Sequence, residues 1–177
     1  STVVKILDIL LEESPDLIIK LVAPTGKAAM RLSDSIDEWA DTRGRKFQVQ
    51  TLHRLLGMRK DGRSWRHGPH NRVKVDLLIV DEASMIDLTM MHRLLGALPD
   101  HTRLILLGDP NQLPSVDTGN VLADLCAGEP GFSSTFAELA SNYVGEVQTI
   151  KRPHHLTDSV CELDKSYRFD PDRGIAA

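Results

Sequence analysis

The chain has 177 residues, of which 41% are hydrophobic and 26% are charged. This length and composition suit one globular domain with a real core, and they exclude a low-complexity or disordered chain. We expect neither a membrane-spanning run nor a secretory leader, and therefore a cytoplasmic protein without a membrane partner. Cys126 and Cys161 lie in apolar local sequence without metal-ligand spacing, so both are predicted to be buried free thiols.

The net charge of -4 is unevenly distributed along the chain. Residues 43–74 contain ten Lys or Arg residues and one acid, Asp61, which gives a local charge of +9 against -13 elsewhere. This segment is a candidate phosphate-contacting surface, and Trp65 within it is a candidate platform for stacking a base. A solvated loop is the alternative, because turn residues are frequent there, and contact with a partner subunit is another.

The first elements expected in chain order are a strand at residues 16–23 and a helix at residues 27–39, joined by a Pro-Thr-Gly-Lys turn. The turn is not a phosphate-binding P-loop, because that motif needs a glycine and a hydroxyl residue where Leu21 and Ala28 stand. Thr25 is placed to cap the helix, whose free amides can then hold an anion such as a DNA phosphate. Capping alone, beside a surface lysine, is the alternative.

The most informative stretch is the aliphatic run at residues 77–80, which ends in Asp81 and Glu82. Four branched aliphatic residues suit a parallel strand that is buried on both faces and presents ligand-binding groups just beyond its carboxyl end. Two adjacent acids there can take separate roles in phosphoryl transfer: Asp81 can hold Mg²⁺ through water, and Glu82 can activate the attacking water. A solvated turn after a core strand is the alternative.

A second aliphatic strand, at residues 103–107, runs into a loop that carries Gln112 to the same sheet edge. A carboxamide can accept from water and donate to a phosphate oxygen, so Gln112 can sense a terminal phosphate; an ordinary turn residue is the alternative. A helix capped by Asp87 lies between the two strands. The alternation of strands and helices predicts a doubly wound α/β domain with a mainly parallel sheet.

Residues 129–157 show weak periodicity, with a short helix expected at residues 135–142 and an irregular crossover around it. A surface loop is the default reading of such an excursion. A contact with another subunit is the alternative.

Several sequence blocks, in this order, resemble the motifs of superfamily 1 DNA helicases, and more narrowly those of the RecD family of exodeoxyribonuclease V alpha subunits. The blocks are residues 23–29 (motif Ia), 51–57 (a further DNA-contacting motif), 81–84 (motif II), 108–113 (motif III), and 165–169 with 174–175 (motif IV). Their order and their spread over nearly the whole chain make the match more specific than any one block. The long segment between motifs III and IV favours the three-subunit complex over stand-alone relatives.

The resemblance implies a RecA-like P-loop NTPase fold with ATP and Mg²⁺ as cofactors. It implies that Asp81 helps to bind Mg²⁺ and that Glu82 is the catalytic base. Gln112 would couple the γ-phosphate to DNA, and Arg168 would reach the γ-phosphate, although a structural ion pair is the alternative for this arginine. The residues implied in DNA binding are Pro24, Thr25, Gly26, Lys27, Thr51 and His53.

The resemblance also implies an ATP-dependent 5′ to 3′ helicase subunit that works with RecB and RecC on single-stranded DNA and DNA ends in double-strand break repair and recombination. Residues 1–177 would form part of its first motor domain, with 43–74 as a basic insertion. Because residues 1–7 resemble the helix after a P-loop, we expect motif I and the second motor domain to lie outside the chain, which alone would hydrolyse no ATP. The alternatives are a stand-alone RecD-like helicase, an unrelated P-loop ATPase, and a non-catalytic DNA- or subunit-binding scaffold.

Overall fold

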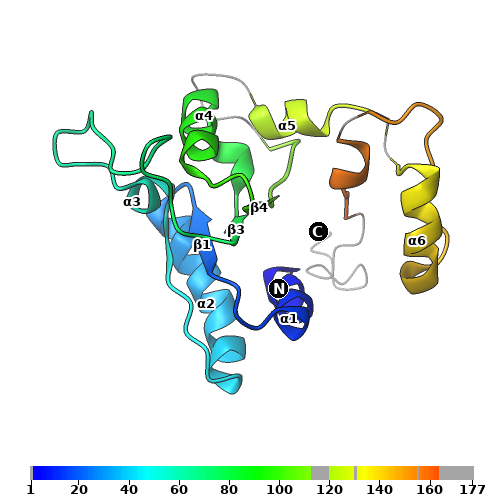
Figure 1. Cartoon of the computed structure of the whole chain (residues 1–177), viewed down its shortest axis with the longest axis horizontal. Helices are drawn as coiled ribbons and strands as arrows, with labels where there is room; N and C mark the ends of the chain where they lie inside the picture. The colour runs from blue at the N-terminus through cyan, green and yellow to red at the C-terminus, as the bar shows by residue number, and fades with distance from the viewer. Residues whose placement is uncertain (1, 113–119, 130, 155, 164–177) are drawn as a thin grey trace, which may run out of the picture. The chain divides into compact units, whose positions relative to one another are not determined.

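Figure 1 shows the computed structural model of the protein, which describes residues 2–112, 120–129, 131–154 and 156–163. The chain forms two compact units, which we call the sheet unit (residues 1–124) and the C-terminal unit (residues 125–177). Arg168 and the rest of motif IV lie outside the described residues. Among the described residues, no helix has the length and apolar character needed to cross a membrane.

The sheet unit is built on a four-stranded sheet in the order β2-β1-β3-β4, in which all neighbouring strands run parallel. The strands are β1 (Ile19–Ala23), β2 (Val49–Thr51), β3 (Leu77–Val80) and β4 (Arg103–Leu106). The helices are α1 (Thr2–Glu13), α2 (Gly26–Thr42), α3 (Leu52–Leu56), α4 (Leu88–Ala97) and α5 (Val121–Cys126), the last of which contains the unit boundary. The predicted α/β fold with a parallel sheet is confirmed.

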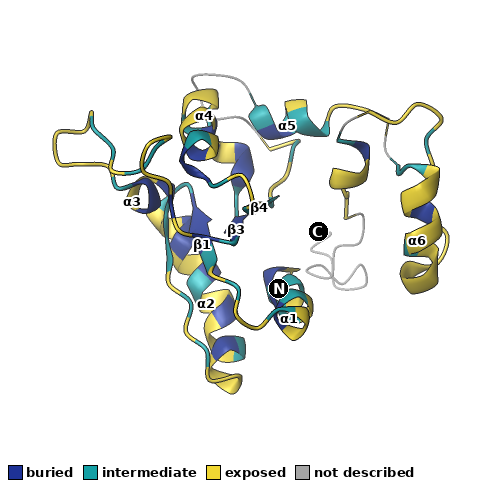
Figure 2. Ribbon diagram, in the orientation of Figure 1, coloured by how far each residue is buried: buried dark blue, intermediate teal, exposed yellow. Residues whose placement is uncertain are grey.

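The core of the sheet unit follows from the apolar periodicity of its elements. Helices α1 and α2 pack on one face of β1 and β3, because each helix repeats aliphatic residues at three- or four-residue spacing. All four residues of β3 are 0% exposed, which confirms the prediction of a strand buried on both faces. Figure 2 shows buried residues gathered on the strands and on the helix surfaces that pack against them. The α1–α2 cluster contains Val3, Leu7, Leu11, Leu21, Leu32, Ile36, Leu77 and Ile79.

Two of the elements that escaped prediction lie inside the basic segment 43–74. Strand β2 has three residues and α3 has five, so neither is long enough to display a period in the sequence. Strand β2 forms the sheet edge beside β1, with Thr51 in register with Ala23. The segment is therefore not one continuous loop, because part of it completes the sheet.

In the C-terminal unit, α6 (Ser134–Val144) contains the helix predicted at residues 135–142. Ser133 caps it, since its Oγ accepts a hydrogen bond from the Phe136 N–H at 3.2 Å. The Ser133 backbone N–H and hydroxyl donate in turn to Asp158, both at 2.7 Å, next to the short 3-10 helix η2 (Thr157–Ser159). These bonds tie the start of α6 to a segment that follows it by more than a dozen residues.

The prediction that both cysteines are buried was wrong. Cys126 is half-buried and Cys161 is exposed, and both are free thiols. Burial raises the pKa of the Cys126 thiol, and the nearby Glu162 carboxylate raises it further. An apolar local sequence did not ensure burial of Cys161, because residues 160–163, where the described part of the chain ends, form no helix or strand that would turn it toward a core.

Candidate functional site

The candidate site lies where the direction of strand order reverses. From β1 the chain moves to the edge strand β2, and it then returns past β1 to form β3 on the other side. In open α/β sheets, ligands bind in the crevice outside the carboxyl ends of the strands at such a switch point. Thr25 follows β1 at this point, and Glu82 follows β3.

An open pocket of about 270 Å³ is present at this edge of the sheet. Its walls come from the start of α2, the turn after β3 and the loop after β4. The lining residues are Thr25, Lys27, Ala28, Arg31, Glu82, Met85 and Gln112. The fold therefore brings motif Ia, motif II and motif III together, although these motifs are far apart in the sequence.

Glu82 is held in an unusual backbone conformation. Its φ of 54° and ψ of 40° lie in the left-handed region, and among the described residues no other non-glycine residue has a positive φ. Such a conformation costs on the order of 1 kcal/mol, and residues of this kind cluster at functional sites. The turn is stabilised because the Glu82 N–H donates to Asp81 Oδ1 at 3.0 Å and the Met85 N–H donates to the Glu82 carbonyl at 3.1 Å.

Asp81 has the chemistry required of a Mg²⁺ ligand. It is half-buried at the end of β3, where its N–H donates to the Val22 carbonyl at 2.9 Å. Mg²⁺ in phosphoryl-transfer sites takes one or two carboxylates and completes its shell with water and substrate phosphates. No group of three possible metal ligands occurs among the described residues, so a bound Mg²⁺ would depend on Asp81, water and nucleotide phosphates. The residues present fit that mode of binding.

Gln112 is linked directly to motif II. The Ser84 hydroxyl donates to Gln112 Oε1 at 3.2 Å, and Ser84 itself is only 2% exposed. Because this bond occupies the amide oxygen, the Gln112 NH₂ group is the part that remains to donate to a phosphate oxygen. The role of Ser84 was not predicted, although a hydroxyl residue two positions after Glu82 was a visible signal.

Gly108 allows the loop after β4 to approach the backbone that follows Glu82. A Cβ at this position would lie 3.0 Å from the Ser84 nitrogen, 3.1 Å from the Ala83 nitrogen and 2.8 Å from Leu122 Cδ2. The neighbouring Leu107 carbonyl accepts a hydrogen bond from the Ala83 N–H at 2.8 Å. Motifs II and III are thus in backbone contact, and a side chain at Gly108 would push them apart.

The start of α2 combines a helix cap with two cations. Thr25 Oγ1 accepts from the Ala28 N–H at 3.2 Å, so the predicted capping is confirmed. Lys27 is exposed on the pocket wall, as is Arg31 one helical turn later. Arg31 was missed, although its four-residue spacing from Lys27 places both on one face of the helix. Pro24 is half-buried before the cap and Gly26 is exposed after it.

Thr51 and His53 do not line this pocket. Thr51 caps α3, since its Oγ1 accepts from the Arg54 N–H at 3.2 Å, and His53 is exposed on the same helix. Thr51 stands at the carboxyl end of β2, in register with Ala23 at the end of β1. The residues predicted to contact DNA therefore form a row along one edge of the sheet, with the pocket at one end.

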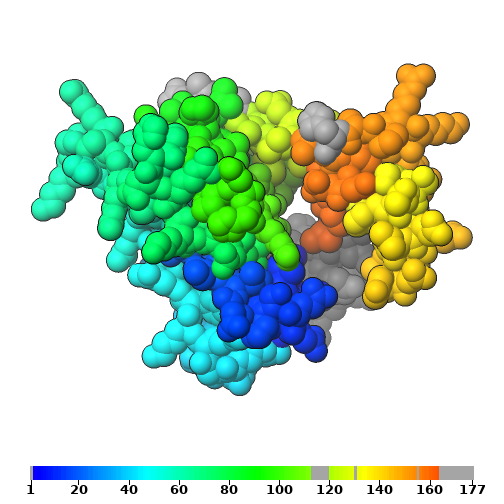
Figure 3. Space-filling view, in the orientation of Figure 1, coloured from blue at the N-terminus to red at the C-terminus, as the bar shows by residue number. Residues whose placement is uncertain are grey.

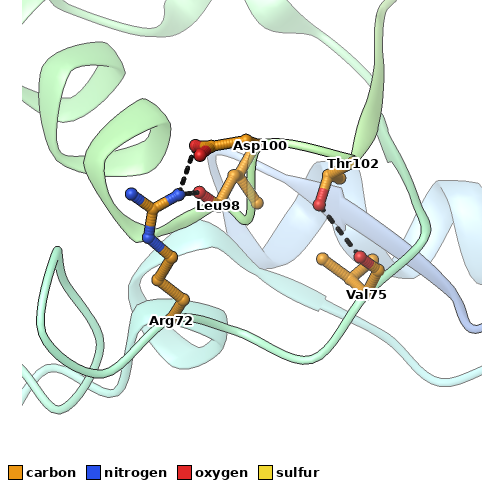
Figure 4. Close-up of polar contacts among 5 residues, drawn as sticks. All are labelled: Arg72, Val75, Leu98, Asp100 and Thr102. Atoms are coloured by element: carbon orange, nitrogen blue, oxygen red, sulfur yellow. Dashed lines mark hydrogen bonds and ion pairs between the residues drawn. The ribbon is translucent and has the colours of Figure 1, made fainter.

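The structure divides the cations of segment 43–74 into two groups. Three of them are used in internal contacts. Arg43 pairs with Asp8 at 2.5 Å, and Arg45 donates to the Pro15 carbonyl at 3.2 and 3.3 Å. Arg72 donates to the Leu98 carbonyl at 2.8 Å and to Asp100 Oδ1 at 2.6 Å, near a bond from the Thr102 hydroxyl to the Val75 carbonyl (Figure 4).

The second group includes the cations of an exposed hairpin at residues 58–66, which we call the basic arm. It follows α3 and projects from the sheet unit, with its side chains standing out at the left of the space-filling view (Figures 1 and 3). Its exposed cations are Arg59, Lys60, Arg63 and Arg66. These four residues, unlike the first group, are available to phosphates.

Asp61 shapes the tip of the basic arm. Its Oδ1 accepts from the Arg63 and Ser64 N–H groups, both at 3.0 Å, and its Oδ2 accepts from the Ser64 hydroxyl. The Ser64 hydroxyl, the two backbone N–H groups and the nearby Arg59 lower the pKa of Asp61 to about 2. The acid of the segment is thus a turn-forming group that stays ionised at neutral pH.

The chain belongs to the AAA domain family, whose model matches residues 1–118. Together with the parallel sheet, this membership confirms the predicted RecA-like α/β fold. The family match covers both strands that carry the acids and Gln112, as well as the basic arm.

Individual relatives carry more specific names. The chain is 42% identical over 171 residues to the RecBCD enzyme subunit RecD of Haemophilus influenzae, covering 89% of this chain and 27% of that protein. It is 40% identical over 190 aligned positions to the RecBCD enzyme subunit RecD of Mycolicibacterium smegmatis, covering 99% and 32%. It is 42% identical over 125 residues to the ATP-dependent RecD2 DNA helicase of Deinococcus radiodurans, covering 71% and 16%.

These relatives confirm the resemblance to RecD proteins that the motifs predicted. The chain spans at most about a third of the length of each of them.

Proposed function

We propose that this chain is the part of an ATP-dependent DNA helicase motor that contacts both the nucleotide and single-stranded DNA. The observation that carries the proposal is the pocket in which Lys27 of motif Ia meets Glu82 and Gln112. An ATPase with no DNA partner has no need for cations of a second motif beside its catalytic carboxylate. A motor that couples hydrolysis to movement needs such a junction.

In the proposed reaction, ATP and Mg²⁺ supply the scissile phosphate and its charge neutralisation, with Asp81 as the metal-binding carboxylate. Glu82 orients and deprotonates the attacking water, a role that suits a carboxylate fixed by a tight turn. The Gln112 NH₂ donates to the terminal phosphate while its oxygen remains bonded to Ser84. Arg168 is proposed as a further phosphate-contacting group.

For DNA, we propose a path along the carboxyl edge of β1 and β2. One end of this path consists of Pro24, Thr25, Gly26 and Lys27, and the other end consists of Thr51 and His53. Phosphates would be contacted by Lys27, by the amides at the start of α2 and by the exposed cations of the basic arm.

The finer assignments follow the relatives' names. Two of these relatives are named RecBCD enzyme subunit RecD, which supports RecB and RecC as partners. We propose DNA ends as the site of action, in double-strand break repair and recombination. A stand-alone helicase is the second candidate, because another relative is named ATP-dependent RecD2 DNA helicase. We further propose 5′ to 3′ movement, residues 1–177 as part of the first motor domain, and a cytoplasmic location.

The test is to replace the matching segment of a full-length RecD by these 177 residues and to measure ATP hydrolysis by the resulting protein within the RecBCD enzyme. Turnover should be stimulated by single-stranded DNA. Gln112→Ala should retain binding of nucleotide and of DNA but lose most of the stimulation, since the phosphate contact is removed. Turnover that is independent of DNA would contradict the motor, and retained stimulation in Gln112→Ala would remove Gln112 from the coupling role.

A further inference from the structure

Trp65 was predicted to be a platform for a base, but its ring is engaged within the protein. The His53 ring of α3 lies 5.6 Å from it, measured between centroids, with the planes tilted by 35°. The Arg93 guanidinium of α4 lies 5.2 Å from the centroid of the same ring. The tryptophan of the basic arm therefore rests on two helices of the sheet unit, in an aromatic contact and a cation–π contact.

The ends of the basic arm are bonded to the end of α3. The Met58 N–H donates to the His53 carbonyl, and the Arg66 N–H donates to the Gly57 carbonyl, both at 3.0 Å. Gly57 has a positive φ of 68°, and a Cβ there would lie 2.6 Å from Arg66 Cβ. The last residue of the arm therefore approaches the end of α3 so closely that only glycine fits at position 57.

Between base and tip, the arm is a short hairpin with little support of its own. Met58 and Trp65 form an antiparallel bridge, and the Arg59 N–H donates to the Ser64 carbonyl at 2.9 Å. An isolated two-stranded hairpin is marginally stable in water. The direction of the arm therefore depends on contacts beyond the hairpin, and Trp65 makes two of them.

We propose that Trp65 is a positioning residue, which locks the basic arm onto α3 and α4 so that the arm's cations and the α3 edge contact one nucleic-acid backbone together. This inference rests on the proposed DNA binding for its purpose, but the locking itself does not require DNA. Without the indole, the arm would be mobile in the free protein. Each binding event would then have to order it, and the lost conformational entropy would weaken the affinity.

The first test is a double-mutant cycle on the 177-residue chain, with binding to a fluorescent oligo-dT strand followed by anisotropy over a range of salt concentrations. Trp65→Ala and the charge variant Arg59→Gln/Lys60→Gln should each weaken binding about two- to fivefold. The combined variant should bind no more weakly than Trp65→Ala alone, because the cations of an unlocked arm no longer contribute to binding. Independent effects that multiply would overturn the proposal.

Two further variants separate positioning from general damage. Trp65→Phe keeps an aromatic ring for His53 and Arg93, so it should restore most of the affinity that Trp65→Ala loses. In a Trp39→Phe background, where Trp65 is the remaining tryptophan, oligo-dT should leave the Trp65 emission largely unchanged. Strong quenching on binding would show that a base stacks on the ring, and the platform hypothesis would replace ours.

If the chain binds no oligonucleotide, that result counts against the proposed function and not against the locking of the arm. The locking is then tested by a measurement without DNA. Hydrogen exchange of the Arg59 amide, which bonds Ser64 across the arm, should be about tenfold faster in Trp65→Ala, while amides of β3 stay protected. Unchanged exchange in the arm would overturn the positioning role.

Discussion

The pocket at the strand ends and the basic arm are both proposed to serve the same DNA-dependent reaction, but they are built differently. The pocket is made by backbone: Glu82 and Gln112 follow neighbouring strands, and Thr25 caps the helix after a third. The arm is placed by side chains, with Trp65 resting on His53 and Arg93. Chemistry that requires fixed distances is thus placed on the sheet, and contact with a long polymer is placed on an outlying hairpin.

This difference gives the two regions different vulnerabilities. A change at Glu82 or Gln112 in the pocket should alter turnover while leaving the affinity for DNA nearly intact, whereas a change in the arm should alter affinity and its salt dependence. Four experiments sharpen or break this contrast.

The largest effect is expected from Glu82→Gln in the exchanged full-length protein. Turnover should fall by about 100-fold or more, because the general base is lost while the side chain keeps its shape. Nucleotide binding and oligo-dT binding should change little. Steady-state hydrolysis and filter binding measure the two quantities, and turnover at the parental rate would remove Glu82 from its assigned role.

Gly108→Ala should disturb the pocket through packing. The new methyl group would meet two backbone nitrogens of motif II at 3.0 and 3.1 Å, so we expect a loss of roughly 1–3 kcal/mol in unfolding free energy. The matched control is Gly96→Ala within α4, where the nearest atom would be Pro69 Cγ at 3.6 Å. Helix propensity predicts that this control is neutral or stabilised by up to about 1 kcal/mol. Urea denaturation measures both, and equal stability of the two variants would contradict the close approach.

Thr25→Asp separates capping from DNA contact at the edge between the two regions. Aspartate caps helices at least as well as threonine, so the unfolding free energy should stay within about 0.5 kcal/mol. Its charge would repel a phosphate beside Lys27, and oligo-dT affinity should fall several-fold relative to Thr25→Ser. If Asp and Ser variants bind equally, Thr25 is a cap alone and the proposed path does not pass it.

The smallest effect concerns the tip of the arm. The pKa of Asp61 should be about 2, compared with 3.8 for a free side chain, and carboxyl carbon NMR shifts can follow it. Because the folded pKa is lowered, the stabilisation that Asp61 gives the turn is complete above about pH 4 and disappears as the pH falls through 2. Ser64→Ala should raise the pKa of Asp61, since the hydrogen bond from the Ser64 hydroxyl is the largest cause of its lowering. An unchanged titration midpoint would contradict this hydrogen bond.

The elements that the sequence predicted correctly are those with a repeated local signal. The aliphatic run of β3, the stripe of α2 and the Asp87 cap of α4 each express several residues of one pattern. Elements with no room for a period, such as β2 and α3, were not predicted. The burial predicted for Cys161 failed for a related reason, since burial depends on distant packing partners.

The sequence by itself determined which chemical groups stand at the strand ends, because parallel strands have their carboxyl ends at one edge of the sheet, independent of loop conformation. Only the tertiary structure decided that Lys27, Glu82 and Gln112 share one pocket, and that Glu82 adopts a left-handed backbone there. It also decided that Arg72 donates a hydrogen bond to the Leu98 carbonyl, whereas Arg59 and Lys60 face solvent. These outcomes depend on distances between segments remote in sequence, which no local pattern encodes.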